Sequence, residues 1–336
     1  MKKHYIIPFF IPFLGCPHKC AFCDQEKITG TETRYAKEAV TAQITSYLKT
    51  IDAKSKEQTY IEVGYFGGSF TGLPFTLQKD LLVEAKSFVE EGIIDGIRVS
   101  TRPDYITKDI LDFLRENSVS TIEIGAQSLD SEVLLKSKRG HLLDNTIQAA
   151  ELIKKGGFNL GLQLMIGLPG DTMEKSIISA KRAAALQPDF VRIYPTLVLK
   201  GTELAKQYSL GQYIPWELDE IINAAKKMYY IFTQQDIKVI RIGLQDSAEL
   251  KKDHLVAGPY HPATGELVQA AVYLDMIGYL VKQNFKKLTD DVYIYCSIYE
   301  QSKIRGQKNT NIIELNKWFP QYHFHIKPTS EIPKNS

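Results

Sequence analysis

The sequence predicts an α/β protein whose core is a partial TIM-type (β/α) barrel of about six β–α units. Short apolar runs that predict strands recur along the first two thirds of the chain, and segments with helical periodicity fill the gaps between them. Near-continuous apolar strands are typical of a parallel sheet that is covered on both faces. Right-handed crossovers then favour a barrel, complete or partial, over a doubly wound open sheet.

The predicted elements alternate regularly along the chain. The strands are expected at 4–13, 60–66, 96–100, 121–128, 159–167 and 190–198. The helices between and after them are expected at 37–51, 76–92, 107–117, 142–157 and 172–187. Thr107 and Asp144 are the predicted N-cap residues of two of these helices, since Thr and Asp side chains accept hydrogen bonds from free backbone N–H groups.

The pattern changes near residue 237. A further strand in KVIRIGL is followed by a loop rich in Gly, Pro and His, a helix, and a strand–helix–strand pattern. The sequence therefore predicts two parts: a barrel over 1–236, and a smaller C-terminal α/β region over 237–336 that completes or covers the barrel.

Composition excludes several classes of protein. The chain has 336 residues, 41 Lys and Arg against 39 Asp and Glu, and 44% apolar residues, which argues against wholesale disorder. No segment approaches the roughly 18 consecutive apolar residues of a membrane span. The net charge of +2 gives no reason to expect a protein that coats polyanions, although a local basic groove can exist within a balanced total.

Three of the four cysteines fall close together, because Cys16, Cys20 and Cys23 form a C-x3-C-x2-C pattern. Thiolates at this spacing in one loop can converge on a soft metal centre. A structural zinc site has four ligands and is closed, so a set of three favours an open and reactive position. A [4Fe–4S] cluster held by three cysteines would keep one iron free for a small molecule.

Two other interpretations of this segment compete with the cluster. A closed zinc site would need His18, Asp24 or the distant Cys296 as its fourth ligand. The N-terminal segment that ends at Cys16 also imitates a lipoprotein signal, but prolines interrupt its apolar run and the two further cysteines have no use there.

CPHKCAFC resembles the signature of the radical SAM family, C-x3-C-x-aromatic-C, with Phe22 as the aromatic residue. The resemblance implies a [4Fe–4S] cluster on Cys16, Cys20 and Cys23, whose free iron binds the methionine part of S-adenosylmethionine (SAM). It also implies that the reduced cluster cleaves SAM, and that the 5′-deoxyadenosyl radical abstracts hydrogen from a substrate held away from water.

The ends of the second and third strands carry further residues of this resemblance. Gly67, Gly68 and Ser69 stand where the family's Gly-Gly-Glu motif holds the amino group of SAM, and Ser69 departs from that motif. Two glycines allow close backbone approach, and a plain tight turn is the alternative. Ser100 stands where relatives place a polar contact to the ribose.

The resemblance extends to the fourth and fifth strands. Arg139 resembles the arginine that pairs with the SAM carboxylate, a task that suits a guanidinium; a solvated surface arginine is the alternative. Gln163 and Met165 match positions that touch the ribose and the adenine, although a Met in a strand is often simply core. Gln127 is a further candidate, or a core amide bonded to backbone.

Two longer segments, 191–204 and 239–268, are similar to the Elongator catalytic-subunit family. Large members of that family pair this barrel with an acetyltransferase domain and modify the wobble uridine of tRNA using acetyl-CoA. The resemblance does not extend to an acetyltransferase domain or to an additional zinc site. Carboxymethylation that depends on acetyl-CoA is therefore not expected of this chain alone.

His261 and Glu266 lie in the segment GPYHPATGELV and are the candidate catalytic residues. They are expected either to hold or deprotonate a substrate at the mouth of the barrel, or to serve a helix start, where the dipole favours a carboxylate.

The sequence thus predicts a radical SAM enzyme that acts on a tRNA base, with SAM, tRNA and an electron donor such as flavodoxin or ferredoxin as partners. A radical SAM enzyme for a small metabolite and a zinc-stabilised, non-catalytic binding protein are the alternatives. The cytoplasm is the expected compartment, since iron–sulfur thiolates require reducing conditions.

Overall fold

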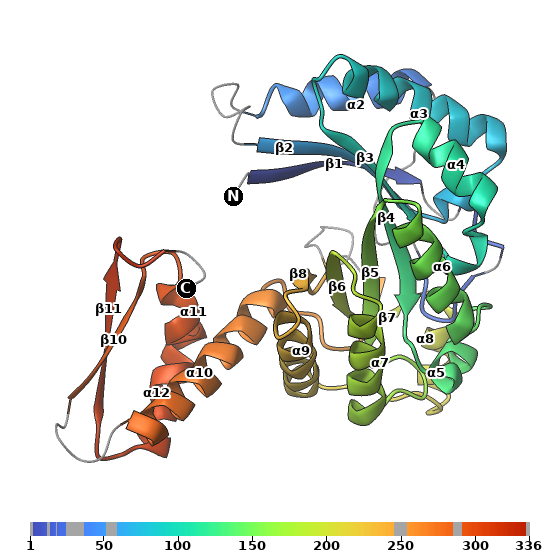
Figure 1. The fold of residues 1–336 in the computed structure, drawn as a ribbon. Helices are drawn as coiled ribbons and strands as arrows, with labels where there is room; N and C mark the ends of the chain where they lie inside the picture. The colour runs from blue at the N-terminus through green and yellow to red at the C-terminus, as the bar shows by residue number, and fades with distance from the viewer. Residues whose placement is uncertain are drawn as a thin grey trace.

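A computed structural model describes residues 3–11, 14–17, 19–24, 37–51, 59–244, 254–284 and 291–333 of the chain. Seven strands form one parallel sheet in the order β1-β2-β3-β4-β5-β6-β8. Their bounds are β1 (Lys3–Ile11), β2 (Thr59–Gly67), β3 (Gly96–Thr101), β4 (Val119–Gln127), β5 (Asn159–Ile166), β6 (Phe190–Pro195) and β8 (Lys238–Ile242). The sheet is curled into a partial barrel (Figure 1), which confirms the predicted fold class.

Helices cover the outer, convex face of the sheet (Figure 1). They are α2 (Lys37–Leu48), α3 (Phe75–Glu90), α4 (Lys108–Glu116), α6 (Leu143–Lys155), α7 (Met173–Ala185) and α9 (Leu218–Thr233). Two short helices, α5 (Ser131–Lys136) and α8 (Glu203–Ser209), lie at the carboxyl end of the sheet. The side chains of alternate strand residues, such as Ile61, Val63 and Ile122, point to this face and form one apolar core with the helices. No helix among the described residues is long and apolar enough to span a membrane.

One of the two predicted N-caps is confirmed. The Thr107 hydroxyl accepts a hydrogen bond from the Ile110 N–H at 3.3 Å, at the start of α4. Asp144 is not an N-cap, because α6 begins at Leu143 and places Asp144 inside its first turn. The side chain that bonds to the backbone at this helix start is Asn145, whose Oδ1 accepts a hydrogen bond from the Leu142 N–H at 2.8 Å.

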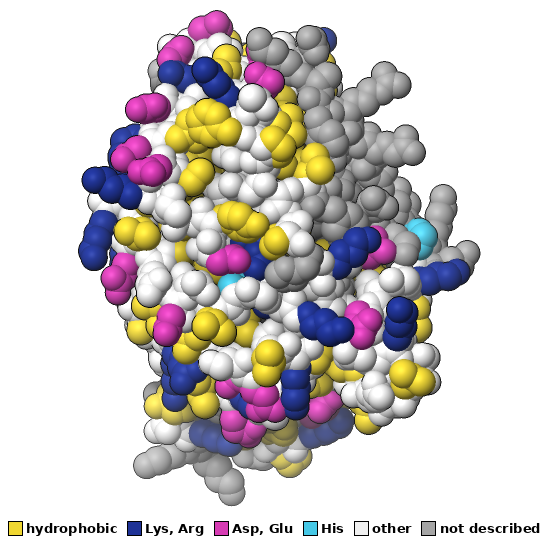
Figure 2. All heavy atoms as spheres, turned by 90° about the vertical axis from the view of Figure 1, so that its right-hand side faces the viewer, with side chains coloured by type: hydrophobic (Ala, Val, Ile, Leu, Met, Phe, Trp, Pro, Cys, Tyr) yellow, Lys and Arg dark blue, Asp and Glu magenta, His cyan; other side chains and the backbone are white. Residues whose placement is uncertain are grey.

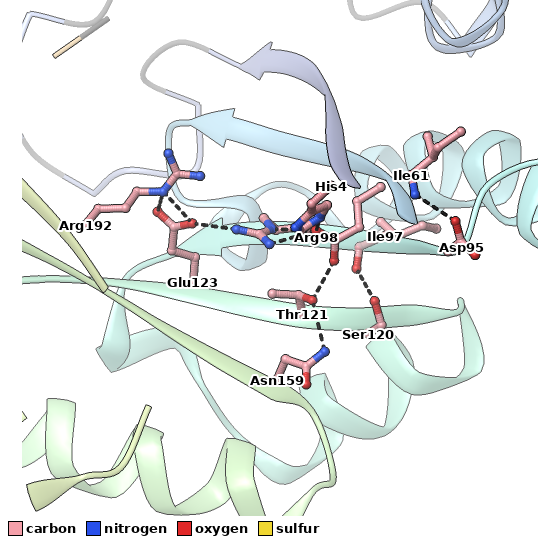
Figure 3. Close-up of polar contacts among 11 residues, drawn as sticks. His4, Ile61, Asp95, Ile97, Arg98, Ser120, Thr121, Glu123, Asn159 and Arg192 are labelled. Atoms are coloured by element: carbon pink, nitrogen blue, oxygen red, sulfur yellow. Dashed lines mark hydrogen bonds and ion pairs between the residues drawn. The ribbon is translucent and has the colours of Figure 1, made fainter. Parts of the chain in front are cut away.

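The inner, concave face of the sheet is buried as well, but charged side chains lie on it, which the near-continuous apolar pattern did not predict. Glu62, Arg98 and Glu123 are at most 2% exposed there. Arg98 donates from Nη2 to Glu62 at 2.7 Å and from Nη1 to Glu123 at 3.4 Å, and Arg192 Nε lies 2.9 Å from Glu123 (Figure 3). His4 Nε2 lies 2.8 Å from the same Glu62 carboxylate. Glu62, Arg98 and Glu123 lie side by side on the concave face, because β2, β3 and β4 are neighbours in the sheet.

The C-terminal part forms its own small core. α10 (Thr264–Asn284), α11 (Gln301–Arg305) and α12 (Thr310–Trp318) pack against one face of a parallel pair of strands, β10 (Asp291–Ser297) and β11 (His323–Thr329). β8 was predicted as part of the C-terminal region. It pairs with β6 and extends the main sheet. A two-residue strand, β7 (Val198–Leu199), pairs with β9 (Leu255–Ala257) beside it.

Candidate functional site

The predicted cysteine loop follows β1 at the carboxyl end of the sheet. Its described residues are held by two backbone hydrogen bonds: the Ala21 N–H donates to the Ser137 carbonyl at 3.0 Å, and the Leu204 N–H donates to the Ala21 carbonyl at 2.7 Å. Ser137 follows α5 and Leu204 lies in α8. The loop is therefore fixed to segments that follow the fourth and sixth strands.

All the cysteines are free thiols, and Cys20, at 8% exposed, is buried. Burial, followed by the charges that Cys20 and Cys16 would carry, raises the pKa of the Cys23 thiol to about 12. Burial and Cys20 also raise the pKa of Cys16, while the Ser69 N–H and the guanidinium groups of Arg102 and Arg139 act in the opposite direction. Cys20 thus lies close enough to Cys16 and Cys23 to oppose ionisation of both thiols.

The donor chemistry of this loop fits an iron–sulfur cluster. A bound cation favours thiolate over thiol and would offset the mutual repulsion of the three sulfur atoms. Within the described ranges, no three Cys, His, Asp or Glu side chains are grouped tightly enough to enclose a single ion. The three sulfur atoms therefore lie in one loop but do not converge on one point. Asp24 and Cys296, the described candidates for a fourth zinc ligand, join no such group. His18 lies outside the described residues.

The Gly67-Gly68 pair lets the loop after β2 touch the loop after β1 backbone to backbone. The Gly68 N–H donates to the Ile11 carbonyl at 2.7 Å, and the Ser69 N–H donates to the Leu14 carbonyl at 3.1 Å. A Cβ atom on Gly68 would lie 2.0 Å from the Leu14 oxygen. A side chain has no room at this position, so the pair does more than form a turn.

Gly68→Ala is therefore expected to displace the cysteine loop without unfolding the barrel. We expect normal circular dichroism and at least a severalfold loss of bound iron after anaerobic reconstitution, because the cysteine loop can no longer pack against the loop after β2. Gly92→Ala is the control, since Gly92 has positive φ but a Cβ atom there would meet nothing within 4 Å. Equal iron loading of the two variants would contradict this prediction.

Ser69 is almost fully buried, at 1% exposed, and its hydroxyl is used within the protein. Its Oγ lies 2.8 Å from Thr101 Oγ1 and accepts a hydrogen bond from the Arg102 N–H at 3.2 Å. Where the resembling family has a carboxylate, this chain has a residue that ties the end of β2 to the end of β3.

Arg139 links the cysteine loop to the fourth strand. It is 6% exposed, which excludes the alternative of a solvated surface arginine. Its Nη1 lies 2.9 Å from Cys20 Sγ, and its Nη2 donates to the Gly125 carbonyl at 2.6 Å. A guanidinium against a cysteine sulfur stabilises the thiolate. Its pairing with a SAM carboxylate stays a prediction.

The other predicted strand-end residues lie at the same edge of the sheet. Gln163 Nε2 donates to Gln127 Oε1 at 3.2 Å, so these two side chains meet across β4 and β5. Gln127 has a left-handed backbone, with φ 64°, at a register shift between the two strands. Met165 is half-buried two residues beyond Gln163, on the same face of β5. Ser100 and Gly68 line one narrow crevice.

Phe22 takes part in an apolar contact at this end of the barrel. Its ring packs against the apolar cluster of Val198, Leu204 and Tyr213, beside α8. In this chain the aromatic residue of the cysteine motif therefore anchors the loop to the barrel wall.

The two candidate catalytic residues lie at the start of α10. His261 Nδ1 accepts a hydrogen bond from the Ala263 N–H at 3.1 Å, as expected for a residue that serves a helix start. Glu266 is exposed in the first turn of α10. A Cβ atom on the neighbouring Gly258 would lie 3.3 Å from the Thr196 carbonyl, so this segment meets the chain directly after β6. No described contact joins either residue to the cysteine loop.

Two residues near the thiols were not predicted. Arg102 is 4% exposed and makes a bidentate pair with Asp104 at 2.9 Å, and its Nη1 has no hydrogen-bond partner among the described residues. Burial, followed by the charges of Arg139 and Arg102, lowers the pKa of His141 to about 3, so its ring is neutral at physiological pH. Arg102 could have been found as a charged residue at a strand end, whereas no local pattern marks His141.

An open pocket of about 550 Å³ lies between the cysteine loop and the segment from α5 to the start of α6. It is lined by Lys19 of the loop, by Leu134, Leu135 and Lys138, and by His141 and Leu142. Figure 2 shows the side of the molecule that faces right in Figure 1, where α5 and α6 lie; basic and acidic side chains alternate there with apolar spots, without one continuous patch of a single charge.

Comparison with known families supports the interpretation of the loop. Residues 10–180 match the Radical SAM superfamily, and residues 188–273 match the Radical_SAM C-terminal domain. The second match ends within α10, before β10, β11, α11 and α12 of the small C-terminal core.

Among curated proteins, the chain is 29% identical over 253 residues to a tRNA uridine(34) acetyltransferase of Methanocaldococcus jannaschii, covering 63% of this chain and 47% of that protein. It is 26% identical over 255 residues to Elongator complex protein 3 of Saccharomyces cerevisiae, covering 63% of this chain and 46% of that protein. The chain thus spans about half the length of these relatives.

Among solved structures, an Elp3 of Methanocaldococcus infernus with an N-terminal deletion superposes with a TM-score of 0.64 at 22% identity. The superposition covers 85% of this chain and 64% of the other, and it shows a shared fold.

Proposed function

Because the chain belongs to the radical SAM superfamily, which its residues 10–180 match, we propose that it uses a [4Fe–4S] cluster and SAM to modify a tRNA base. The observation that carries this proposal is the cysteine loop at the carboxyl end of the barrel, with the Arg139 guanidinium 2.9 Å from Cys20 Sγ. Bound there, the cluster and SAM would supply a 5′-deoxyadenosyl radical for hydrogen abstraction.

The residues at this edge divide into two groups. Cys16, Cys20 and Cys23 would bind the cluster; the charge of Arg139 would favour the thiolates of Cys16 and Cys23, and that of Arg102 would favour the thiolate of Cys16. The second group would contact SAM from the ends of β2 to β5; its members are Gly67, Gly68, Ser69, Ser100, Gln127, Gln163 and Met165. Phe22 would support this group indirectly by holding the loop in place.

The proposed substrate class rests on the relatives. Proteins named tRNA uridine(34) acetyltransferase and Elongator complex protein 3 share the barrel region with this chain, which favours a tRNA base over a small metabolite. His261 and Glu266 are retained as candidates for substrate contacts, since their segment lies beside the end of β6.

An electron donor such as flavodoxin or ferredoxin belongs to the proposal, because cleavage of SAM requires an electron from outside the chain. The pocket beside Lys19 and Lys138 is where we expect this donor to approach, since Lys19, the residue before Cys20, lines it. The reducing cytoplasm is the compartment in which such chemistry operates.

The deciding experiment is anaerobic reconstitution with iron and sulfide, followed by incubation with SAM and dithionite. We expect a brown protein that releases 5′-deoxyadenosine, and altered nucleosides when tRNA from a deletion strain is compared with wild type by mass spectrometry. Cleavage of SAM with unchanged tRNA nucleosides would favour a small metabolite. One bound zinc and no iron would instead identify a zinc-stabilised binding protein.

A further inference from the structure

The small C-terminal sheet presents one face to its helices and the other to solvent. β10 and β11 run parallel in register, and their inward residues Val292, Cys296 and Ile326 belong to the core formed with α10, α11 and α12. In Figure 1 the helices lie on one side of this pair only. Tyr293 and Tyr295, which alternate with the inward residues, are 50% and 66% exposed.

The exposed side chains form an ordered aromatic and basic surface. The Tyr293 ring stacks on His325, its partner in register, with centroids 5.0 Å apart and an interplanar angle of 21°. Lys327 pairs in register with Tyr295 and places its Nζ 5.7 Å from the Tyr293 ring. Asp291, which lies on the same face, is 2.6 Å from His325 Nε2.

This combination suits single-stranded nucleic acid better than a peptide. Nucleobases stack on aromatic rings presented by a β-sheet, and cations between the rings contact the phosphates. A peptide that adds a strand would use the backbone at a sheet edge and would gain nothing from two tyrosines that stand out from the face. Lys327 supplies a positive charge on this face with which a phosphate group can pair.

We infer that Tyr293, Tyr295, His325 and Lys327 form a stacking surface for an unpaired segment of the RNA substrate. This inference rests on the proposed tRNA substrate and extends it, because the surface lies beyond residue 273, where the family matches end. The surface would hold the RNA while the target base enters the barrel.

The test uses the cluster-free chain and a fluorescently labelled, unmodified tRNA transcript, so it does not depend on radical chemistry. Stacking contributes about 1–3 kcal/mol per base, so the double variant Tyr293→Ala/Tyr295→Ala should weaken binding by about tenfold or more. Lys327→Gln should lower the salt dependence of log Kd by about one unit. Tyr279→Ala is the matched control, since Tyr279 is 64% exposed on α10; it should leave Kd within about twofold.

The possible failures are distinguishable. Tight, salt-dependent tRNA binding that the double variant does not change would overturn the stacking surface and leave the proposed function intact. Absence of RNA binding by a chain that still cleaves SAM would overturn both the surface and the tRNA substrate. A dimer that the double variant dissociates would overturn the inference in favour of a second copy of the chain as the occupant.

Discussion

Cys20→Ala is expected to abolish iron binding and SAM cleavage altogether. A cluster held by three thiolates cannot lose one ligand and persist, and Cys20 is the buried one of the three, in contact with Arg139. The barrel should stay folded, because the loop lies outside the apolar core. Iron and sulfide content after anaerobic reconstitution, and 5′-deoxyadenosine release with dithionite, are the measurements.

Cys296→Ala is the matched control, because Cys296 is a buried free cysteine in the separate C-terminal core. It should keep full iron loading and full SAM cleavage. If Cys20→Ala retained the cluster, or if Cys296→Ala lost it, the assignment of the three-cysteine loop as the cluster site would fail.

Arg98→Met is expected to cause the largest loss of stability of any single substitution on the concave face. Methionine keeps most of the length of the side chain but leaves the Glu62 and Glu123 carboxylates buried without the guanidinium between them. Removing one partner of a buried ion pair costs about 3–5 kcal/mol, which is a large share of the roughly 5–15 kcal/mol typical of a folded protein. Urea denaturation of the cluster-free chain measures this change in the free energy of unfolding.

The control for this substitution is Lys155→Met on the surface of α6. Lys155 Nζ lies 3.6 Å from Glu151, and both side chains are more than half exposed. An exposed pair four residues apart on a helix contributes only about 0.3–0.5 kcal/mol. A comparable loss in the two variants would show that the concave network is not buried in solution.

The sequence was sufficient for the order and winding of the strands because the outward strand residues, such as Ile61 and Ile122, are locally apolar and the crossover rule fixes the rest. It was insufficient for the concave face. Arg98 meets Glu62 and Glu123 only because strands far apart in the sequence become neighbours, and no local spacing encodes that meeting. Charged residues inside otherwise apolar strands were the available signal.

The site divides in the same way. Cys16, Cys20 and Cys23 were identified from spacing alone, because ligands that share a loop leave a local pattern. His141 left no such pattern, because its environment depends on burial and on Arg102 from another segment as well as on the nearby Arg139. The role of Ser69 as a link to Thr101 and Arg102 also depends on a neighbouring strand, so only the structure reveals it.

The buried charges on the concave face also restrict the register in which the strands can pair during folding. Side chains alternate between the two faces of a strand, so a slip of β3 by one residue would turn Arg98 toward the helices and leave Glu62 facing no cation. Such a misaligned sheet would bury an isolated charge in hydrocarbon, at a cost that no apolar contact offsets. An all-aliphatic interior would tolerate several alignments, whereas this one accepts a single alignment.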